Sequence, residues 1–291
     1  MNTIKFPLLN LSLKISRIAI NIFGIDIYWY AIIIVFAIII ALLWCKLNSK
    51  KYNIEFEKIT DLAVIAIPIS IICARLYYVI FNLKYYLQYP LEILNFRDGG
   101  LAIYGGIIGG IITCYIYTKK NKIDNLDLLD TIAPAVALAQ SIGRWGNFVN
   151  VEAYGTETNL PWKMGIIENG IEKFVHPTFL YESICAFLIF IILVKLQNKR
   201  KFKGEITYLY LIMYSFVRFF IEGLRIDSLM LFNFRISQIL SLAIFVSITV
   251  IFIHKSIKCS SMSKKDEKWR KMEHEKRPQP LKNKQKSLTN M

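Results

Sequence analysis

The sequence lacks the elements from which most soluble enzymes build their sites. It has only three histidines among 291 residues, and none of its five cysteines stands in the C-x-x-C spacing of a zinc site. It contains no Gly-x-Ser-x-Gly element, no Walker motif and no Asp-rich apolar segment that would bind catalytic metal ions. We therefore expect no metal and no cofactor, and we expect the cysteines to be small buried apolar side chains.

Charge is also scarce, and it is mostly of one sign. Charged residues make up 20% of the chain, with 36 Lys and Arg against 21 Asp and Glu, so the net charge is +15. Hydrophobic residues make up 55% before glycine is counted, whereas soluble domains reach about 45–50% with glycine included. This composition excludes a largely disordered chain, argues against a soluble enzyme and favours a membrane protein.

Seven segments are candidates for membrane-spanning helices. A helix that crosses a bilayer needs about 20 largely apolar residues, and we predict an all-α polytopic membrane domain over residues 28–254. The segment 128–148 is the weakest candidate, because it contains Asp130, Gln140 and Arg144. The predicted spans are 28–45, 59–81, 101–118, 128–148, 178–194, 206–221 and 236–253.

The basic residues predict how these spans are oriented. The loops 46–58, 119–127 and 195–205 and the tail from residue 255 hold 24 of the 36 Lys and Arg. Basic loops remain in the cytoplasm, so an even number of spans must separate 119–127 from 195–205, and 128–148 must be one of them. The sequence therefore predicts seven spans with the N-terminus outside and the C-terminus cytoplasmic.

The two ends of the chain lie outside this domain. Residues 1–27 lack the cleavage site of a signal peptide, and we predict an amphipathic segment on the outer face. Residues 255–291 are rich in Lys, Glu, Gln and Ser, so we expect a disordered cytoplasmic tail drawn to anionic lipids. Nucleic acid is not an expected partner, because the basic residues lie in short loops and a tail and not on a folded face.

Polar side chains of the predicted spans fall mainly in the outer half of the bilayer. Arg75, Arg144 and Arg218 lie near the outer ends of their spans, as do Tyr30 and Tyr104. Ionisable groups inside a membrane mark functional sites, and three guanidinium groups at one depth suggest a phosphate ligand. Ion pairs with nearby glutamates are the alternative role of these arginines. A transporter would place its site near the midplane, so the distribution favours chemistry on a lipid or an exported segment.

Two motifs stand out within the predicted domain. Residues 143–155 read Gly-Arg-Trp-Gly-Asn-Phe-Val-Asn-Val-Glu-Ala-Tyr-Gly, which is far more polar than a helix end requires. Residues 99–110 contain six glycines. Close helix packing explains Gly106 and Gly110 as well as catalysis would, and Gly99 and Gly100 predict a turn whose N–H groups are able to face an anion.

Through the first motif the chain resembles the prolipoprotein diacylglyceryl transferase family, whose signature is Gly-Arg-x-Gly-Asn-Phe-x-Asn-x-Glu-x-x-Gly. The resemblance extends over residues 20–250. Further matching blocks are Trp29-Tyr30, Ala74 to Tyr78, the Gly-rich segment, His176-Pro177-Thr178 with Tyr181-Glu182, Tyr214 with Arg218, and Arg235 to Gln238. It implies a bacterial plasma-membrane enzyme that transfers the diacylglyceryl group of phosphatidylglycerol to the lipobox cysteine of an exported prolipoprotein, releasing glycerol 1-phosphate. The alternative is a polytopic transporter of an anionic lipid or metabolite.

The resemblance also implies which residues matter. These are Tyr30, Arg144, Asn147, Glu152, Gly155, Tyr214 and Arg218. We add Arg75 and His176 as candidate substrate-binding residues beside Arg144, Glu152, Gly155 and Tyr214. Many family members have histidine where this chain has Tyr104, so a histidine-centred base mechanism does not transfer to it.

Candidate roles follow from the chemistry of these side chains. Arg144 and Arg218 would bind the headgroup phosphate and stabilise the leaving group, while Asn147 and Tyr30 orient the glycerol by hydrogen bonds. Tyr104 would either relay the thiol proton or position substrate, since a phenol with a pKa of about 10 is a poor base. His176 precedes a proline, so a helix-start turn explains it as well as catalysis does.

Overall fold

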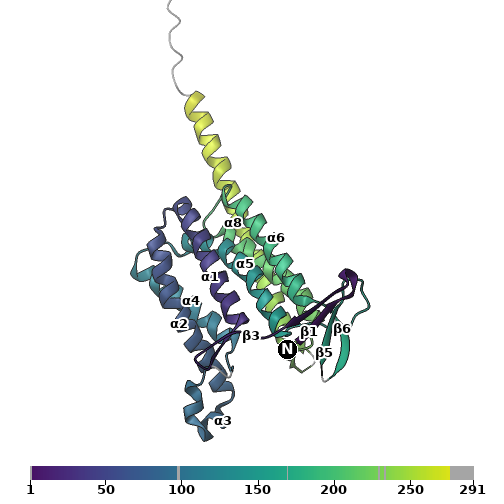
Figure 1. The fold of residues 1–291 in the computed structure, drawn as a ribbon. Coiled ribbons are helices and arrows are strands. Elements are labelled where there is room, and N and C mark those ends of the chain that lie inside the picture. The colour runs from purple at the N-terminus through teal and green to yellow at the C-terminus, as the bar shows by residue number, and fades with distance from the viewer. Residues whose placement is uncertain (1, 97–98, 169, 229, 233, 276–291) are drawn as a thin grey trace, which may run out of the picture.

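The computed structural model describes residues 2–96, 99–168, 170–228, 230–232 and 234–275. Eight α-helices in these ranges form the body of the molecule (Figure 1). They are α1 (Trp29–Asn48), α2 (Phe56–Phe81), α3 (Leu83–Gln88), α4 (Ile103–Lys120), α5 (Asn125–Asn150), α6 (Thr178–Gln197), α7 (Glu205–Leu224) and α8 (Ile236–Glu275). Short 3-10 turns lie at η1 (Pro7–Leu9), η2 (Ser49–Tyr52) and η3 (Pro90–Leu94).

Six of the described helices are long and apolar enough to cross a membrane, in agreement with six predicted spans. The predicted span 101–118 corresponds to α4. This helix is less apolar than the other six, because its 18 residues include four glycines and two terminal lysines. The glycines let α4 pack tightly on α2. A Cβ at Gly109 would lie 2.7 Å from Cys73 Cβ, so a larger residue there would force the two helices apart.

Helix α5 lies at the centre of the bundle, packed against α1, α6 and α7. Its N-terminus is capped by the Asp124 carboxylate, which accepts the N–H groups of Leu126 (3.0 Å) and Asp127 (3.2 Å). The helix ends at Asn150, and the next residue, Val151, has a left-handed backbone conformation (φ 52°) that turns the chain back. This turn begins the second half of the polar motif and therefore positions the candidate site.

A buried polar network ties α5 to the loop between α6 and α7. Asp130 is fully buried, and its carboxylate pairs with Arg200 (2.9 Å) and accepts bonds from the N–H groups of Gly204 and Thr207 (both 2.8 Å). Both carboxylate oxygens therefore accept hydrogen bonds, which offsets the cost of burying the charge. The network lies at the end of α5 that is remote from the polar motif.

The domain is not all-α, because residues 2–15 and 164–175 form a four-stranded antiparallel sheet. Its order is β2 (Leu11–Ile15), β1 (Asn2–Phe6), β5 (Met164–Glu168) and β6 (Ile171–Val175). Residues 2–15 of the predicted segment 1–27 are therefore strands of this sheet and not a separate amphipathic surface segment: β1 pairs with β5, with Ile4 opposite Ile166, and both side chains are buried. Two small hairpins complete the strands, β3 (Ile18–Ile22) with β4 (Ile25–Tyr28) and β7 (Met230–Leu231) with β8 (Phe234–Arg235).

The sheet lies beside the polar-motif end of α5, and the long helix α8 extends beyond the other helices at the opposite end (Figure 1). Phe148 of α5 and Phe179 of α6 join Ile4 and Ile166 in one apolar cluster, which fixes the sheet on the helices. The prediction of a disordered tail is wrong for residues 255–275, because α8 continues through them. Residues 276–291 lie outside the described residues.

Candidate active site

A buried carboxylate, Glu182, is the centre of the candidate site. It lies in the second turn of α6 and is 5% exposed. Its Oε1 accepts Arg218 Nη1 of α7 at 2.6 Å and lies 3.8 Å from Arg225 Nη1, while its Oε2 pairs with Arg144 of α5. One carboxylate therefore gathers arginines from α5, from α7 and from the residue that follows α7, and the predicted convergence of Arg144 and Arg218 is present in the structure.

Two further acids hold the arginines in place. Glu222 lies one helical turn after Arg218 and pairs with its Nη2 at 2.5 Å, while Arg225 binds both oxygens of Asp227, at 2.9 and 2.7 Å. Burial alone would raise the pKa of the Asp227 carboxyl, but the hydrogen bonds from Arg225 outweigh it and lower that pKa below its usual value. Of the three arginines Arg144 is the most accessible, with 22% of its side chain exposed.

The end of α5 adds a chain of hydrogen bonds to Arg144. Its Nη1 donates to Asn147 Oδ1 at 3.2 Å, and Asn147 Nδ2 donates to Glu152 Oε1 at 2.9 Å. The left-handed turn at Val151 brings Glu152 back to Asn147. Tyr30, at the start of α1, lies against the same turn of α5, so the structure brings together four of the predicted site residues.

Tyr30 reaches this position because residue 146 is a glycine. A Cβ at Gly146 would lie 2.7 Å from Tyr30 Cδ2, closer than side-chain carbons approach one another. We expect Gly146→Ala to displace the phenol and reduce turnover about tenfold or more, since small misplacements of positioning groups are costly. The measurement is the transfer rate of purified protein, with Gly143→Ala as the matched control because its Cβ would meet Ile34 at an acceptable 3.4 Å. Equal rates in the two variants would contradict the role of this contact.

His176 lies in the turn that leads from β6 into α6, and Gly155, from the segment after α5, packs against it. The Gly155 N–H donates to the His176 carbonyl at 3.0 Å, and a Cβ at Gly155 would lie 2.8 Å from His176 Cβ. His176 Nδ1 is 3.3 Å from Tyr181 Oη, which accepts the Trp162 indole N–H at 2.8 Å. These contacts explain the glycine and the histidine by close packing at the start of α6, the helix that carries the central Glu182.

Arg75 is not part of the arginine cluster that the sequence predicted. Its guanidinium donates to four backbone carbonyls and lies over two aromatic rings, so it holds the segment between α2 and α4. The carbonyls belong to Glu92, Ile93, Gly99 and Gly100, and the rings to Tyr86 and Phe96. Arg225 takes the third place beside Glu182. The sequence signal for Arg225 is its spacing from Arg218 and Glu222, seven and three residues, which predicts one shared face for a helix that continues to residue 225. In the structure α7 ends at Leu224 and Arg225 follows it.

The two predicted tyrosines of the later spans also have partners of their own. The Tyr104 hydroxyl lies 2.8 Å from Ser237 Oγ, at the contact between α4 and α8. Tyr214 stacks on Tyr210, with ring centres 5.8 Å apart, and Tyr210 donates to Gln140 at 2.9 Å. Neither contact joins these tyrosines to the Glu182 cluster, so the predicted role of Tyr214 rests on the resemblance and that of Tyr104 on the chemistry of its phenol.

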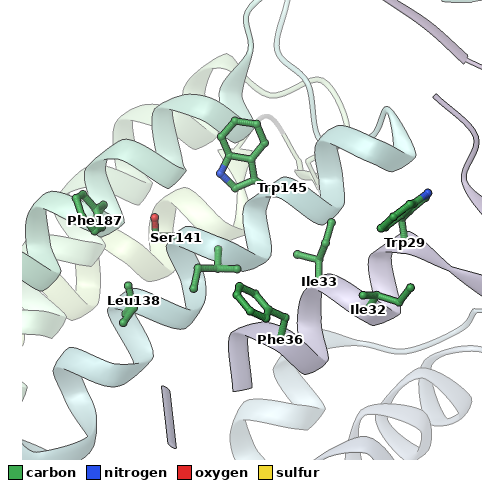
Figure 2. Close-up of a pocket in the computed structure, with 9 residues that line it drawn as sticks. Trp29, Ile32, Ile33, Phe36, Leu138, Ser141, Trp145 and Phe187 are labelled. Atoms are coloured by element: carbon green, nitrogen blue, oxygen red, sulfur yellow. The ribbon is translucent and has the colours of Figure 1, made fainter. Parts of the chain in front are cut away.

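An apolar pocket lies between α1, α5 and α6. Its volume is about 480 Å³, and it is formed by one face of α1 from Trp29 to Phe36, one face of α5 from Leu138 to Trp145, and Phe187 of α6 (Figure 2). Within the part of the chain that the structure describes, no group of three or more His, Cys, Asp or Glu is arranged to hold a metal ion.

The comparisons with known proteins agree with the predicted resemblance. The family model described as prolipoprotein diacylglyceryl transferase matches residues 17–254. A phosphatidylglycerol–prolipoprotein diacylglyceryl transferase of Finegoldia magna is 50% identical over 82% of this chain and 95% of its own length. Proteins of the same name from Clostridioides difficile and Enterococcus faecalis are 50% and 47% identical, over 78% and 82% of this chain and 90% of their own lengths. The chain belongs to the prolipoprotein diacylglyceryl transferase family.

Proposed function

We propose that this protein transfers the diacylglyceryl group of phosphatidylglycerol to the lipobox cysteine of exported prolipoproteins and releases glycerol 1-phosphate. The names and coverage of its relatives support this reaction. The observation that carries the proposal is the pairing of Arg144 and Arg218 on one buried carboxylate, Glu182. The same helix α5 also lines an apolar pocket, with Trp145, the residue after Arg144, in its lining. A phospholipid has the same two parts, an anionic headgroup and apolar chains.

In this reaction the cysteine sulfur attacks the glycerol carbon that bears the phosphate. A carbon–sulfur bond forms, the carbon–oxygen bond breaks, and its electron pair leaves with the phosphate oxygen. Negative charge therefore grows on the phosphate in the transition state, where fixed donors stabilise it most. Arg144 is the accessible donor of the cluster, and Arg218 is held behind it through Glu182.

The attacking sulfur has to lose its proton, and the cluster assists that step. A free thiol has a pKa of about 8.5 and becomes a thiolate more readily near a cation. Arg144 supplies that cation, and Tyr30 with Asn147 would hold the glycerol hydroxyls while the sulfur approaches. The thiol proton ends on a nearby acceptor or on the departing phosphate. The hydrogen bond between Tyr104 and Ser237 favours a positioning role for Tyr104 over that of a base.

We place this site at the outer leaflet of the bacterial plasma membrane. In this arrangement α4 crosses the membrane together with the six more apolar helices, the N-terminus is outside and the C-terminus is in the cytoplasm. The basic loops support this orientation, because they lie at the opposite ends of the helices from Arg144 and Arg218. Phosphatidylglycerol and the lipobox segment would then meet where exported chains leave the bilayer.

The experiment gives purified full-length protein phosphatidylglycerol and a synthetic lipobox peptide. We expect the mass of the peptide to rise by one diacylglyceryl group on its cysteine, and no rise when that cysteine is replaced by serine. No mass gain, together with movement of phosphatidylglycerol across liposomes that contain the protein, would favour a transporter and overturn the proposal.

A further inference from the structure

Two buried serines join α5 to α6, the helices that carry Arg144 and Glu182. The hydroxyl of Ser141 on α5 (Figure 2) donates to the Ser183 carbonyl at 2.9 Å, and the hydroxyl of Ser183 on α6 donates to the Ser141 carbonyl at 2.8 Å. The two Oγ atoms lie 3.3 Å apart, and both residues are buried. The helices therefore exchange one hydrogen bond in each direction, at a close approach that small side chains permit.

This arrangement differs from the usual behaviour of hydroxyl groups inside helices. Such hydroxyls commonly bond to a carbonyl one turn earlier in their own helix, as those of Thr113 in α4, Thr131 in α5 and Ser215 in α7 do. A serine hydroxyl has a single proton, and in the α5–α6 pair both protons are committed to the neighbouring helix. The role open to this pair is therefore to position the helices and not to donate to a substrate.

The serine pair lies within one helical turn of the ion pair between Arg144 and Glu182. Ser183 is the next residue after Glu182 on α6. Ser141 lies three residues before Arg144 on α5, which is about 4.5 Å of helix rise and places both on one face. The ion pair holds the two helices together through long side chains. The serine bonds are made to backbone atoms, so they also fix how far one helix slides along the other.

We propose that Ser141 and Ser183 are positioning residues, whose reciprocal hydrogen bonds hold α5 and α6 in the register that directs Arg144 and Arg218 at one phosphate. The inference rests on the proposed function, because it takes the phosphate to be that of the donor lipid. Arg144 belongs to α5, whereas Glu182, which also pairs with Arg218, belongs to α6. A shift of α6 along α5 would therefore misalign the two guanidinium groups, and a misplacement of about 1 Å costs up to about 100-fold in rate.

The first test removes one hydroxyl at a time. We expect purified Ser141→Ala and Ser183→Ala each to lower kcat about threefold to tenfold, which corresponds to about 0.6–1.4 kcal/mol, the range of interhelical hydrogen bonds in membranes. The KM for phosphatidylglycerol should stay within about twofold, because Arg144 remains to bind the headgroup and the loss falls on the transition state.

Ser215→Ala is the matched control. Ser215 is 3% exposed and lies three residues before Arg218, the same spacing as that of Ser141 before Arg144. Its hydroxyl, however, bonds only to carbonyls of its own helix. Removal of this buried hydroxyl should leave kcat within about twofold of the unmodified protein, because no bond between helices is lost.

A second measurement separates positioning from a general loss of structure. In a chain that already carries Glu182→Gln the arginines are no longer gathered, so adding Ser183→Ala should slow transfer less than about twofold further. A structural defect would instead multiply the loss, because independent effects add in free energy. Unchanged kcat in both serine variants, equal slowing of Ser215→Ala, or full multiplication in the combined variant would overturn the positioning role. Absence of transfer by the unmodified protein would instead overturn the proposed function.

Discussion

Replacing Glu182 by glutamine is expected to reduce the transfer rate about 100-fold to 1,000-fold, the range seen when a preorganised charge-stabilising group is lost. The amide keeps the size of the side chain but removes the negative charge that holds Arg144 and Arg218 together. The two guanidinium groups would then repel each other in a partly buried setting, and their donors would no longer point at one phosphate.

The measurement is the initial rate of diacylglyceryl transfer to a lipobox peptide by purified protein over a range of phosphatidylglycerol concentrations. Glu172→Gln is the matched control, because Glu172 pairs with Lys5 on the exposed sheet and exposed pairs contribute little. A rate for Glu182→Gln within threefold of the control would refute the central role of this carboxylate.

Arg144→Lys should also lose most of the activity, by about 100-fold, because a lysine replaces a planar fork with a single point charge. Arg144 contacts Asn147 and Glu182 at the same time and still has N–H groups free to meet a ligand. A lysine ammonium cannot hold these partners and a phosphate in one plane. The hydrogen-bond chain to Glu152 would lose its first link.

The conservative nature of this substitution makes it informative, since the charge of the site is unchanged. The assay is the same transfer reaction, with Arg17→Lys as the control because Arg17 is an exposed residue between β2 and β3. Its contact with the Trp29 N–H is made by its backbone carbonyl, which the substitution keeps. Turnover of Arg144→Lys close to that of the unmodified protein would show that charge alone suffices, and it would contradict the bidentate role.

The sequence predicts the helices well and the sheet not at all. Long apolar runs reveal spans by composition, and six predicted spans coincide with described helices apolar enough to cross a membrane. The pairing of Ile4 with Ile166 leaves no such signature, because it joins residues far apart in the chain. The alternation of apolar and polar residues in 2–15 is the two-residue period of a strand. The same alternation also fits an amphipathic surface segment, because nothing in the sequence shows which segment pairs with residues 2–15.

The sequence likewise predicts only part of the candidate site. Counting residues along a span predicts how deep a side chain lies, which placed Arg75, Arg144 and Arg218 at one level. It does not predict the direction in which each side chain points around the bundle, and Arg75 points to the carbonyls between α2 and α4. Which helices are neighbours depends on packing, so Arg225 could be found only from its spacing to Arg218 and Glu222.

The pairing of β1 with β5 has a consequence for how the protein is made. β1 leaves the ribosome before its partner β5, which follows after α1 to α5, so β1 remains unpaired with β5 while these helices are synthesised. Glu182 lies later still, just beyond β6. The arginines therefore meet their shared carboxylate only after most of the chain has been synthesised, and unfinished chains hold no assembled site with which to bind lipid.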